Sequence, residues 1–173
     1  MSSEFILNLV KKAKNGSAEA FGELYGMYAT ELFRFAYYYT GSQTTAEDCV
    51  SEAVCLAFEN LPQLKKNEAF RSWMFKILFN CCKKAQKIKY LESGNAEISS
   101  VAELSAPTED HNEKISLKNA LKKLSDEERE IIILHYAIGY NSKEIGDILG
   151  MKDATVRSKL SRAVAKIREM LII

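Results

Sequence analysis

Apolar residues recur every three or four positions along most of the chain, and the strict alternation that marks half-buried strands is scarce. This spacing is typical of amphipathic helices. The longest stripe consists of Phe21, Leu24, Tyr28, Leu32, Phe35 and Tyr39. The pattern therefore predicts an all-α fold.

Two further stripes follow in the first half of the chain. The second stripe consists of Val50, Ala53, Ala57 and Leu61, and the third of Phe70, Trp73, Ile77, Cys81 and Ala85. Pro62 ends the second helix, because proline removes a backbone hydrogen bond and clashes with the preceding turn. With a short helix near Glu4–Lys14, these elements predict an N-terminal helical bundle over residues 1–89.

The next segment differs in composition. Residues 90–112 are rich in Ser and Glu, contain Gly94 and Pro107, and show weak periodicity. Like charges extend such a chain. We therefore expect a flexible acidic linker that joins two small helical domains.

The second domain is predicted over residues 113–173, where helical periodicity resumes. Ser125 and Glu128 form a capping box, in which each side chain satisfies a first-turn amide. Gly139 ends the helix that this box opens. Asn141 or Ser142 can cap the helix that follows.

A helix-turn-helix is predicted near the C-terminus. Gly150 begins a three-residue turn, and Asp153 is predicted to cap the last helix. Val156, Leu160, Ala163 and Ile167 form the buried stripe of this helix. Its other face carries Thr155, Arg157, Ser158, Lys159, Ser161 and Arg162. Donors in the first half of a recognition helix reach base edges and phosphates, so we predict DNA binding. The alternative is an amphipathic helix with a solvated basic face.

The charge distribution supports this prediction despite a net charge of only +1. Residues 70–90 and 154–168 contain basic residues and no acid, whereas residues 91–113 contain acids and no Lys or Arg. Phosphate attraction depends on local potential, so near neutrality of the whole chain does not exclude DNA.

Other chemistry finds little support in the sequence. The four cysteines, Cys49, Cys55, Cys81 and Cys82, lack metal-ligand spacing, and no nucleophile–base pattern is present. We expect no metal, no cofactor and no catalytic residue. Without a signal sequence or a long apolar run, we expect a cytoplasmic protein with reduced thiols and no membrane insertion.

Several segments, in a fixed order, carry a resemblance to a known family. They are Ala20–Tyr25 (AFGELY), Ala46–Glu52 (AEDCVSE), Phe70–Asn80 (FRSWMFKILFN), Leu124–Tyr136 (LSDEEREIIILHY), Lys143–Gly150 (KEIGDILG) and Ala154–Ala163 (ATVRSKLSRA). The chain resembles bacterial RNA polymerase sigma factors of the extracytoplasmic-function (ECF) group over about residues 17–85 and 115–171.

The resemblance implies a polymerase contact in the second helix. Asp48, Ser51 and Glu52 match the segment that docks on the clamp helices of core RNA polymerase. The two carboxylates lie four residues apart and so share one helix face. An ordinary solvated acidic face is the alternative.

The resemblance also assigns the two basic blocks to promoter elements. The third helix approaches the minus-ten element, with candidate contacts at Arg71, Lys76, Asn80, Lys83, Lys84 and Lys87. The loop around Leu61–Ala69 helps to capture a base there. Trp73 either stacks on a base or packs in the core. The helix-turn-helix reads the minus-thirty-five element, and the helices before it contribute to the polymerase flap contact.

The function implied is promoter-directed initiation of transcription, with core RNA polymerase, promoter DNA and an anti-sigma factor as partners, in a stress response. The acidic linker either occupies a basic RNA exit channel or merely stays soluble and extended. One rival is a stand-alone transcription regulator that binds an operator as a dimer. A second rival is a metal-dependent nuclease that uses Glu47, Asp48 and Glu52.

Overall fold

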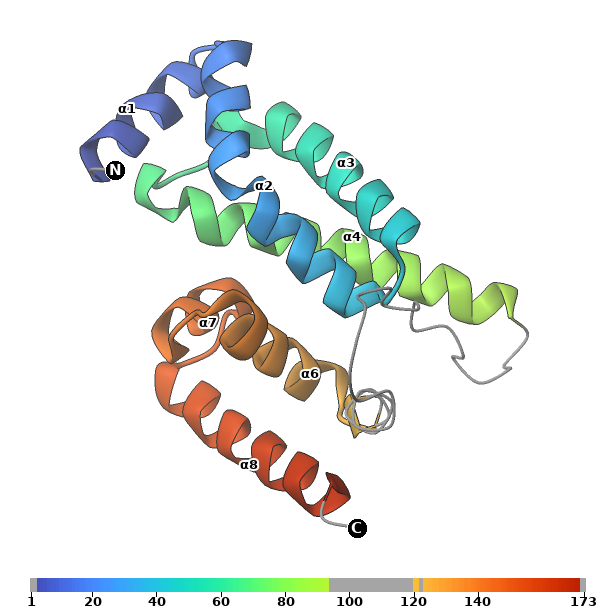
Figure 1. The fold of residues 1–173 in the computed structure, drawn as a ribbon. Coiled ribbons are helices and arrows are strands. Elements are labelled where there is room, and N and C mark those ends of the chain that lie inside the picture. Colours follow the sequence, from blue (N-terminus) through green and yellow to red (C-terminus); the bar gives the residue numbers. More distant parts are fainter. Residues whose placement is uncertain (1–2, 94–119, 122, 172–173) are drawn as a thin grey trace, which may run out of the picture. The chain divides into compact units, whose positions relative to one another are not determined.

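The computed structural model describes residues 3–93, 120–121 and 123–171. The chain divides into two compact units, Met1–Ile98 and Ser99–Ile173. Every regular element within the described ranges is helical (Figure 1), which confirms the predicted all-α class. Within those ranges, no helix combines the length and apolar character needed to span a bilayer.

The first unit is built from α1 (Ser3–Lys14), α2 (Ala18–Thr40), α3 (Gln43–Asn60) and α4 (Phe70–Glu92). The α2, α3 and α4 helices pack lengthwise against one another, and α1 packs on α2 (Figure 1). The predicted short N-terminal helix and the three longer helices are therefore confirmed. Gly41 adopts a left-handed conformation (φ 69°) that ends α2.

The core of the first unit follows the predicted stripes on α2 and α3. Of the α2 stripe, Tyr28 alone is half-buried, and the others are buried. The buried face of α3 is rich in small residues: Ala46, Cys49, Val50, Ala53 and Ala57. Small side chains allow close approach of the neighbouring helices, since less volume separates the backbones.

The buried face of α4 is displaced from the predicted stripe. Trp73, Ile77 and Ala85 are only half-buried. The buried residues are Phe70, Met74, Phe75, Leu78, Cys81 and Cys82. Because α4 packs against both α2 and α3, its buried face is wider than a single stripe and centred one position later.

A compact connection joins α3 to α4. It contains two short 3-10 turns, η1 (Leu61–Gln63) and η2 (Asn67–Ala69). Pro62 lies in the first turn, which explains why α3 ends at Asn60. On the C-terminal side α4 continues to Glu92, three residues into the predicted linker, and residues 94–112 of that linker lie outside the described residues.

The second unit contains α6 (Asp126–Ile132), the π-helical turn η3 (Ile133–Ile138), α7 (Ser142–Leu149) and α8 (Asp153–Leu171). The capping box of Ser125 and Glu128 is present. Asn141 caps α7 and forms a second box with Glu144, which resolves the alternative between Asn141 and Ser142.

Glycines shape both connections in this unit. Gly139 (φ 88°) and Gly150 (φ 70°) are left-handed, as predicted for the ends of their helices. Gly146 has a different role, because a Cβ atom there would lie 2.5 Å from the carbonyl oxygen of Met151. The missing side chain therefore lets the turn fold back onto α7.

One predicted cap was wrong. Asp153 is the first residue of α8, and its carboxylate accepts a hydrogen bond from Arg157 at 2.6 Å. The amides of Thr155 and Val156 instead bond the carbonyl oxygen of Lys152. An aspartate in the first helical turn still favours the helix, because its charge complements the helix dipole.

Candidate nucleic-acid and polymerase interfaces

The α8 helix presents a polar face beside the turn that begins at Gly150. Five of the predicted recognition residues are exposed: Thr155, Arg157, Ser158, Ser161 and Arg162. Val156 and Ala163 are buried, and Leu160 and Ile167 pack against the same core. The predicted division of α8 into an apolar and a polar face is therefore confirmed.

Lys159 departs from the predicted arrangement. Its side chain is only 27% exposed and forms an ion pair with Glu127 of α6. Lys166, about two turns further on, pairs with Glu128 at 2.5 Å. The prediction placed Lys159 on the polar face with the other five residues. In the structure it is engaged with α6, because the capping turn of α6 places a row of carboxylates beside this edge of α8.

The two arginines among the predicted recognition residues are held by other residues of α8. Arg157 forms an ion pair with Asp153, which lies one helical turn before it. The guanidinium of Arg162 donates to the carbonyl oxygen of Ser158 at 3.3 Å. Both contacts are exposed to solvent, so replacing either of them by a contact with a charged partner costs little free energy.

The α4 helix carries the second basic surface. Lys76, Asn80, Lys83 and Lys87 are exposed. Their spacing of four, three and four residues places them on one face, opposite the buried Leu78 and Cys82. Lys83 also lies 5.1 Å from the centre of the Phe79 ring. We call these four residues the α4 outer face.

Arg71 and Lys84 lie at the edges of α4 and not on its outer face. Arg71 pairs with Glu31 of α2 at 3.2 Å. Lys84 pairs with Glu52 of α3 at 2.9 Å. The pKa of Lys84 is raised because the Glu52 carboxylate accepts its hydrogen bond. The structure therefore separates the six minus-ten candidates into four that share a face and two that bridge helices.

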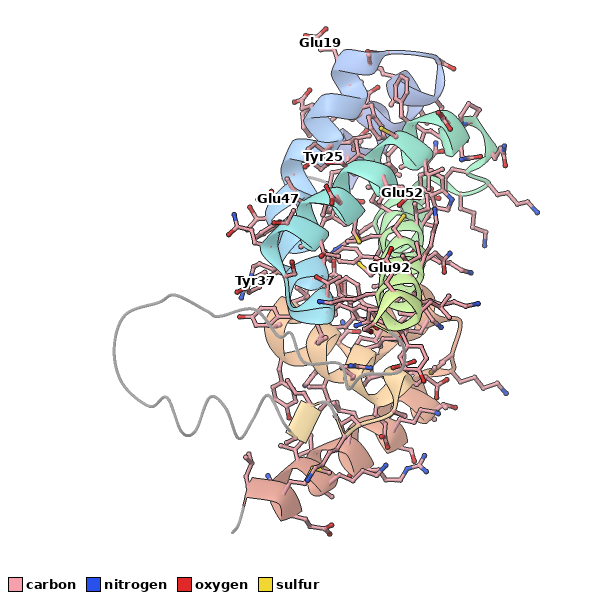
Figure 2. The ribbon with its side chains drawn as sticks, turned by 90° about the vertical axis from the view of Figure 1, so that its right-hand side faces the viewer. Glu19, Tyr25, Tyr37, Glu47, Glu52 and Glu92 are labelled. Atoms are coloured by element: carbon pink, nitrogen blue, oxygen red, sulfur yellow. The ribbon has the colours of Figure 1, made fainter. Side chains whose placement is uncertain are left out.

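The acidic side chains of α3 point in different directions. Asp48, Ser51 and Glu52 are all exposed. Glu52 projects toward α4, whereas Glu47 lies on the other side of α3 (Figure 2). Glu47 and Glu52 thus diverge, which removes the geometric basis for a nuclease site built on Glu47, Asp48 and Glu52.

Trp73, a candidate for base stacking, and His135, which precedes the helix-turn-helix, both make local packing contacts. Trp73 is half-buried, with its ring 6.1 Å from that of Phe70. The Nδ1 atom of His135 lies 2.9 Å from the carbonyl oxygen of Tyr140, across the π-helical turn. Both contacts are local, so each side chain supports its own segment.

The cysteines form a small buried group at the contact of α3 and α4. Cys49, Cys81 and Cys82 are buried, and Cys55 is exposed. Burial raises the pKa of Cys81 to about 11. A hydrogen bond between Cys82 and Cys49 lowers the pKa of Cys49 and raises that of Cys82. A raised pKa keeps a thiol protonated and unreactive, so Cys81 and Cys82 behave as packing residues.

Sequence reasoning missed the cationic tip of the connection between α3 and α4. Lys65 and Lys66 are exposed there, between the buried Leu64 and the turn η2. The signal was present as two adjacent lysines, but it lay outside the long basic block. Lys14 of α1 also contacts this connection, and no local sequence pattern predicts that contact.

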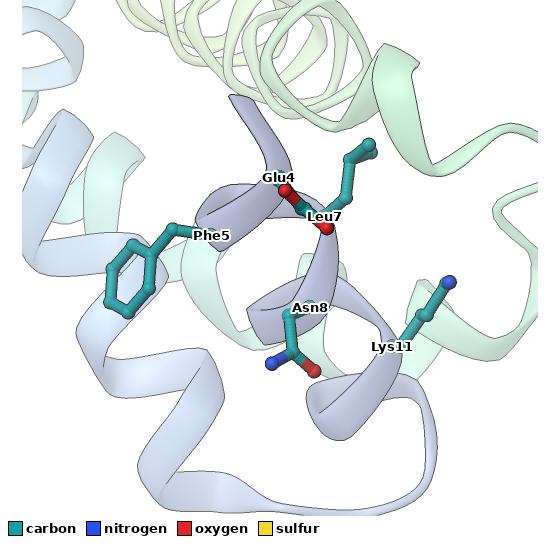
Figure 3. A pocket seen from close by; sticks show the side chains of 5 residues that line it. All are labelled: Glu4, Phe5, Leu7, Asn8 and Lys11. Carbon is teal, nitrogen blue, oxygen red and sulfur yellow. The ribbon is translucent and has the colours of Figure 1, made fainter. Parts of the chain in front are cut away.

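A cavity of about 610 Å³ lies elsewhere, on α1. It is lined by Glu4, Phe5, Leu7, Asn8 and Lys11, all from one helix (Figure 3). It includes none of the candidate interface residues. A hollow lined by one helix is open, so it does not enclose a small molecule as ligand pockets do.

Comparison with known proteins gives the family of the chain. Residues 24–87 match the family model of Sigma-70 region 2, and residues 114–167 match that of Sigma-70, region 4. The RNA polymerase sigma factor SigV from Bacillus subtilis is 30% identical over 145 residues, which are 82% of this chain and 84% of SigV.

The ECF RNA polymerase sigma factor SigW from the same organism is 26% identical over 176 residues, covering 94% of each chain. The chain belongs to the ECF group of RNA polymerase sigma factors.

The fold of this sigma factor agrees with that assignment. The sigma factor RpoE from Bartonella quintana, solved in complex with the anti-sigma factor NepR, superposes with a TM-score of 0.74 at 26% identity. The superposition covers 90% of this chain and 99% of RpoE. The region 2 match includes most of α4, and the region 4 match includes most of α8.

Proposed function

We propose that the protein binds core RNA polymerase in the cytoplasm and directs it to promoters by binding alone, without covalent chemistry. The first unit acts at the minus-ten element and the second at the minus-thirty-five element. The observation that carries this proposal is the polar face of α8, which follows a tight glycine turn and gathers two arginines and three hydroxyls.

In the second unit, α8 enters the major groove with its N-terminal half. Arg157 and Arg162 read base edges, because a guanidinium pairs bidentately with guanine. Thr155, Ser158 and Ser161 hold phosphates. Lys159 contributes by keeping α8 against α6 through Glu127, and its share in DNA contact requires that this pair open.

In the first unit, the α4 outer face lies along the DNA backbone near the minus-ten element. Its three lysines attract phosphate, and Asn80 offers both a donor and an acceptor to a base. Arg71 and Lys84 support this face from its edges, because each joins α4 to a neighbouring helix. The opening of the duplex is favoured by contacts with bases and backbone that form only after unstacking.

The exposed face of α3 docks on the clamp helices of the polymerase. Asp48 and Ser51 are exposed, and Glu52 exchanges its pair with Lys84 for a basic residue of the partner. Docking both units on one scaffold raises the effective concentration of each for its promoter element. Each unit alone therefore binds DNA weakly.

An anti-sigma factor holds the protein inactive until a stress signal arrives. Support comes from RpoE, which is 26% identical and was solved in complex with the anti-sigma factor NepR. To block promoter binding, such a partner must cover the exposed faces of α4 and α8, because these faces carry the DNA contacts proposed above.

One binding experiment separates this function from that of a stand-alone regulator. Fluorescently labelled promoter DNA is titrated with the protein, with core polymerase, and with both together. We expect sequence-specific binding only for the mixture, and retention of the protein by immobilised core polymerase. Tight, specific binding by the protein alone, as a dimer and without polymerase, contradicts the proposal.

A further inference from the structure

Lys14, the last residue of α1, reaches across to the connection between α3 and α4. Its Nζ atom donates to the carbonyl oxygen of Leu64 at 2.6 Å and to Oδ1 of Asn67 at 3.3 Å. The residues are 50 and 53 positions apart in sequence, so this is a tertiary contact. Hydrogen bonds from a charged donor are stronger than neutral ones.

The bond to Leu64 sits at the centre of the connection. Leu61 and Leu64 are both buried, and they anchor the first 3-10 turn, whose end is closed by a bond between their backbones. Leu64 then leaves the turn in an extended conformation. The α1 helix contacts both η1 and η2, so Lys14 extends an existing packing contact.

The two acceptors of Lys14 flank the exposed residues Lys65 and Lys66. Leu64 precedes them and Asn67 follows them, so one ammonium group bonds the backbone before the cationic tip and a side chain directly after it. The tip directly precedes η2 and α4. A short segment clamped at both ends can direct long side chains with little loss of conformational entropy on binding.

We propose that Lys14 is a positioning residue for promoter opening, which holds the connection Leu61–Ala69 so that Lys65 and Lys66 bind phosphates of the strand unpaired at the minus-ten element. Lys14 lies outside residues 24–87, which match the Sigma-70 region 2 model. The inference rests on the function proposed above for the first unit, and it adds α1 to the promoter-opening apparatus.

The test uses full-length protein assembled with core polymerase. A labelled single strand carrying the minus-ten region of a promoter used by the wild type is titrated with each holoenzyme. Lys14→Met removes the donors and keeps the apolar stem, and Lys14→Arg keeps a cationic donor. Lys12→Met is the matched control, because it removes an exposed charge from the same turn of α1. Affinity for core polymerase and thermal unfolding are measured in parallel.

We expect Lys14→Met to weaken binding of the single strand about tenfold, as loss of a charged hydrogen bond implies. Lys12→Met and Lys14→Arg stay within about twofold of the wild type on the same scale. The joint variant Lys65→Met/Lys66→Met is also weak, and adding Lys14→Met to it causes no further loss. Core polymerase affinity is unchanged in every variant. This lack of additivity distinguishes positioning of the two lysines from a general structural role.

Three results overturn the inference. The first is that Lys14→Met binds the single strand as tightly as Lys12→Met does. The second is that Lys14→Met weakens strand binding by the same factor in the Lys65→Met/Lys66→Met background, and the third is that its affinity for core polymerase falls in parallel. Should Lys14→Met not fold, Asn67→Ala removes one acceptor and leaves α1 intact; it is expected to weaken the single strand by a smaller factor, and wild-type affinity overturns the inference. A wild-type holoenzyme that binds no minus-ten strand refutes the proposed function itself.

Discussion

Lys84 of α4 and Glu52 of α3 form an ion pair with Nζ and Oε1 2.9 Å apart. The pair connects the helix proposed to meet DNA with the helix proposed to meet polymerase. Both side chains are substantially exposed, at 64% and 42%. Exposed pairs contribute little to stability, so a partner charge can replace either member.

Breaking this pair from its two sides should affect polymerase binding differently. Lys84→Met leaves Glu52 available, so affinity for core polymerase is expected to stay equal or rise by a small factor. Glu52→Gln removes the charge that the partner needs and should weaken that affinity a few-fold. The double variant should match Glu52→Gln. Titration of labelled core polymerase measures all three, and a loss of affinity in Lys84→Met contradicts the exchange of partners.

Gly146→Ala should destabilise the second unit. The new Cβ atom meets the carbonyl oxygen of Met151 at 2.5 Å, and backbone must shift to relieve it. We expect a loss of about 1–3 kcal/mol in the free energy of unfolding. Gly26→Ala is the control, because its Cβ meets nothing within 4 Å and it lies inside α2. That change should stabilise by about 0.5–1 kcal/mol. Denaturant unfolding followed by circular dichroism measures the stability of both variants. A Gly146→Ala variant as stable as the wild type contradicts the close approach of Met151 to Gly146.

Arg162→Ala should change which promoters are used. If the guanidinium reads a base, promoters with the preferred upstream base lose about 1–3 kcal/mol of binding and others lose little. Arg168→Ala, which removes an exposed cation from the last turn of α8, is the control. Transcription from a library of minus-thirty-five sequences gives the readout. Uniform weakening across the library assigns Arg162 to a phosphate instead.

The stability of the second unit should depend on acid through Glu128. Its pKa is lowered chiefly because it accepts a hydrogen bond from Lys166, with a further one from the Ser125 backbone. A carboxylate with a lowered pKa contributes stability above its unfolded pKa of about 4.3, and loses it as pH falls through the folded value.

Glu128→Gln should therefore be less stable than the wild type at neutral pH, by at most about 1 kcal/mol for a pair at the surface. The difference should shrink as pH falls below about 4.3. Thermal unfolding over a pH series measures it, with the exposed Glu169→Gln as a control. A difference that is constant with pH shows that charge on Glu128 is not the cause.

Local signals in the sequence were sufficient for most elements and several of their ends, although not for the cap of α8. Ser125 with Glu128, and the glycines at 139 and 150, act through bonds within a few residues, so the sequence alone identifies them. The polar face of α8 was equally accessible, because helical spacing fixes which residues share a face.

Tertiary contacts were not accessible in this way. Lys159 pairs with Glu127, and Lys14 with Leu64, across 32 and 50 residues, and nothing local specifies such a partner. The displaced core face of α4 has the same cause, since it depends on where α2 and α3 lie. The division of the minus-ten candidates into an outer face and two bridging residues therefore emerged only from the fold.

Mapping of transcript starts tests the central claim most directly. Core polymerase, with and without the purified protein, transcribes genomic DNA, and the starts are sequenced. We predict a new set of starts that share two upstream elements at fixed separation, and their loss on combined Lys76→Ala/Lys83→Ala substitution in the α4 outer face. An unchanged set of starts, with no association of the protein with polymerase, contradicts the account.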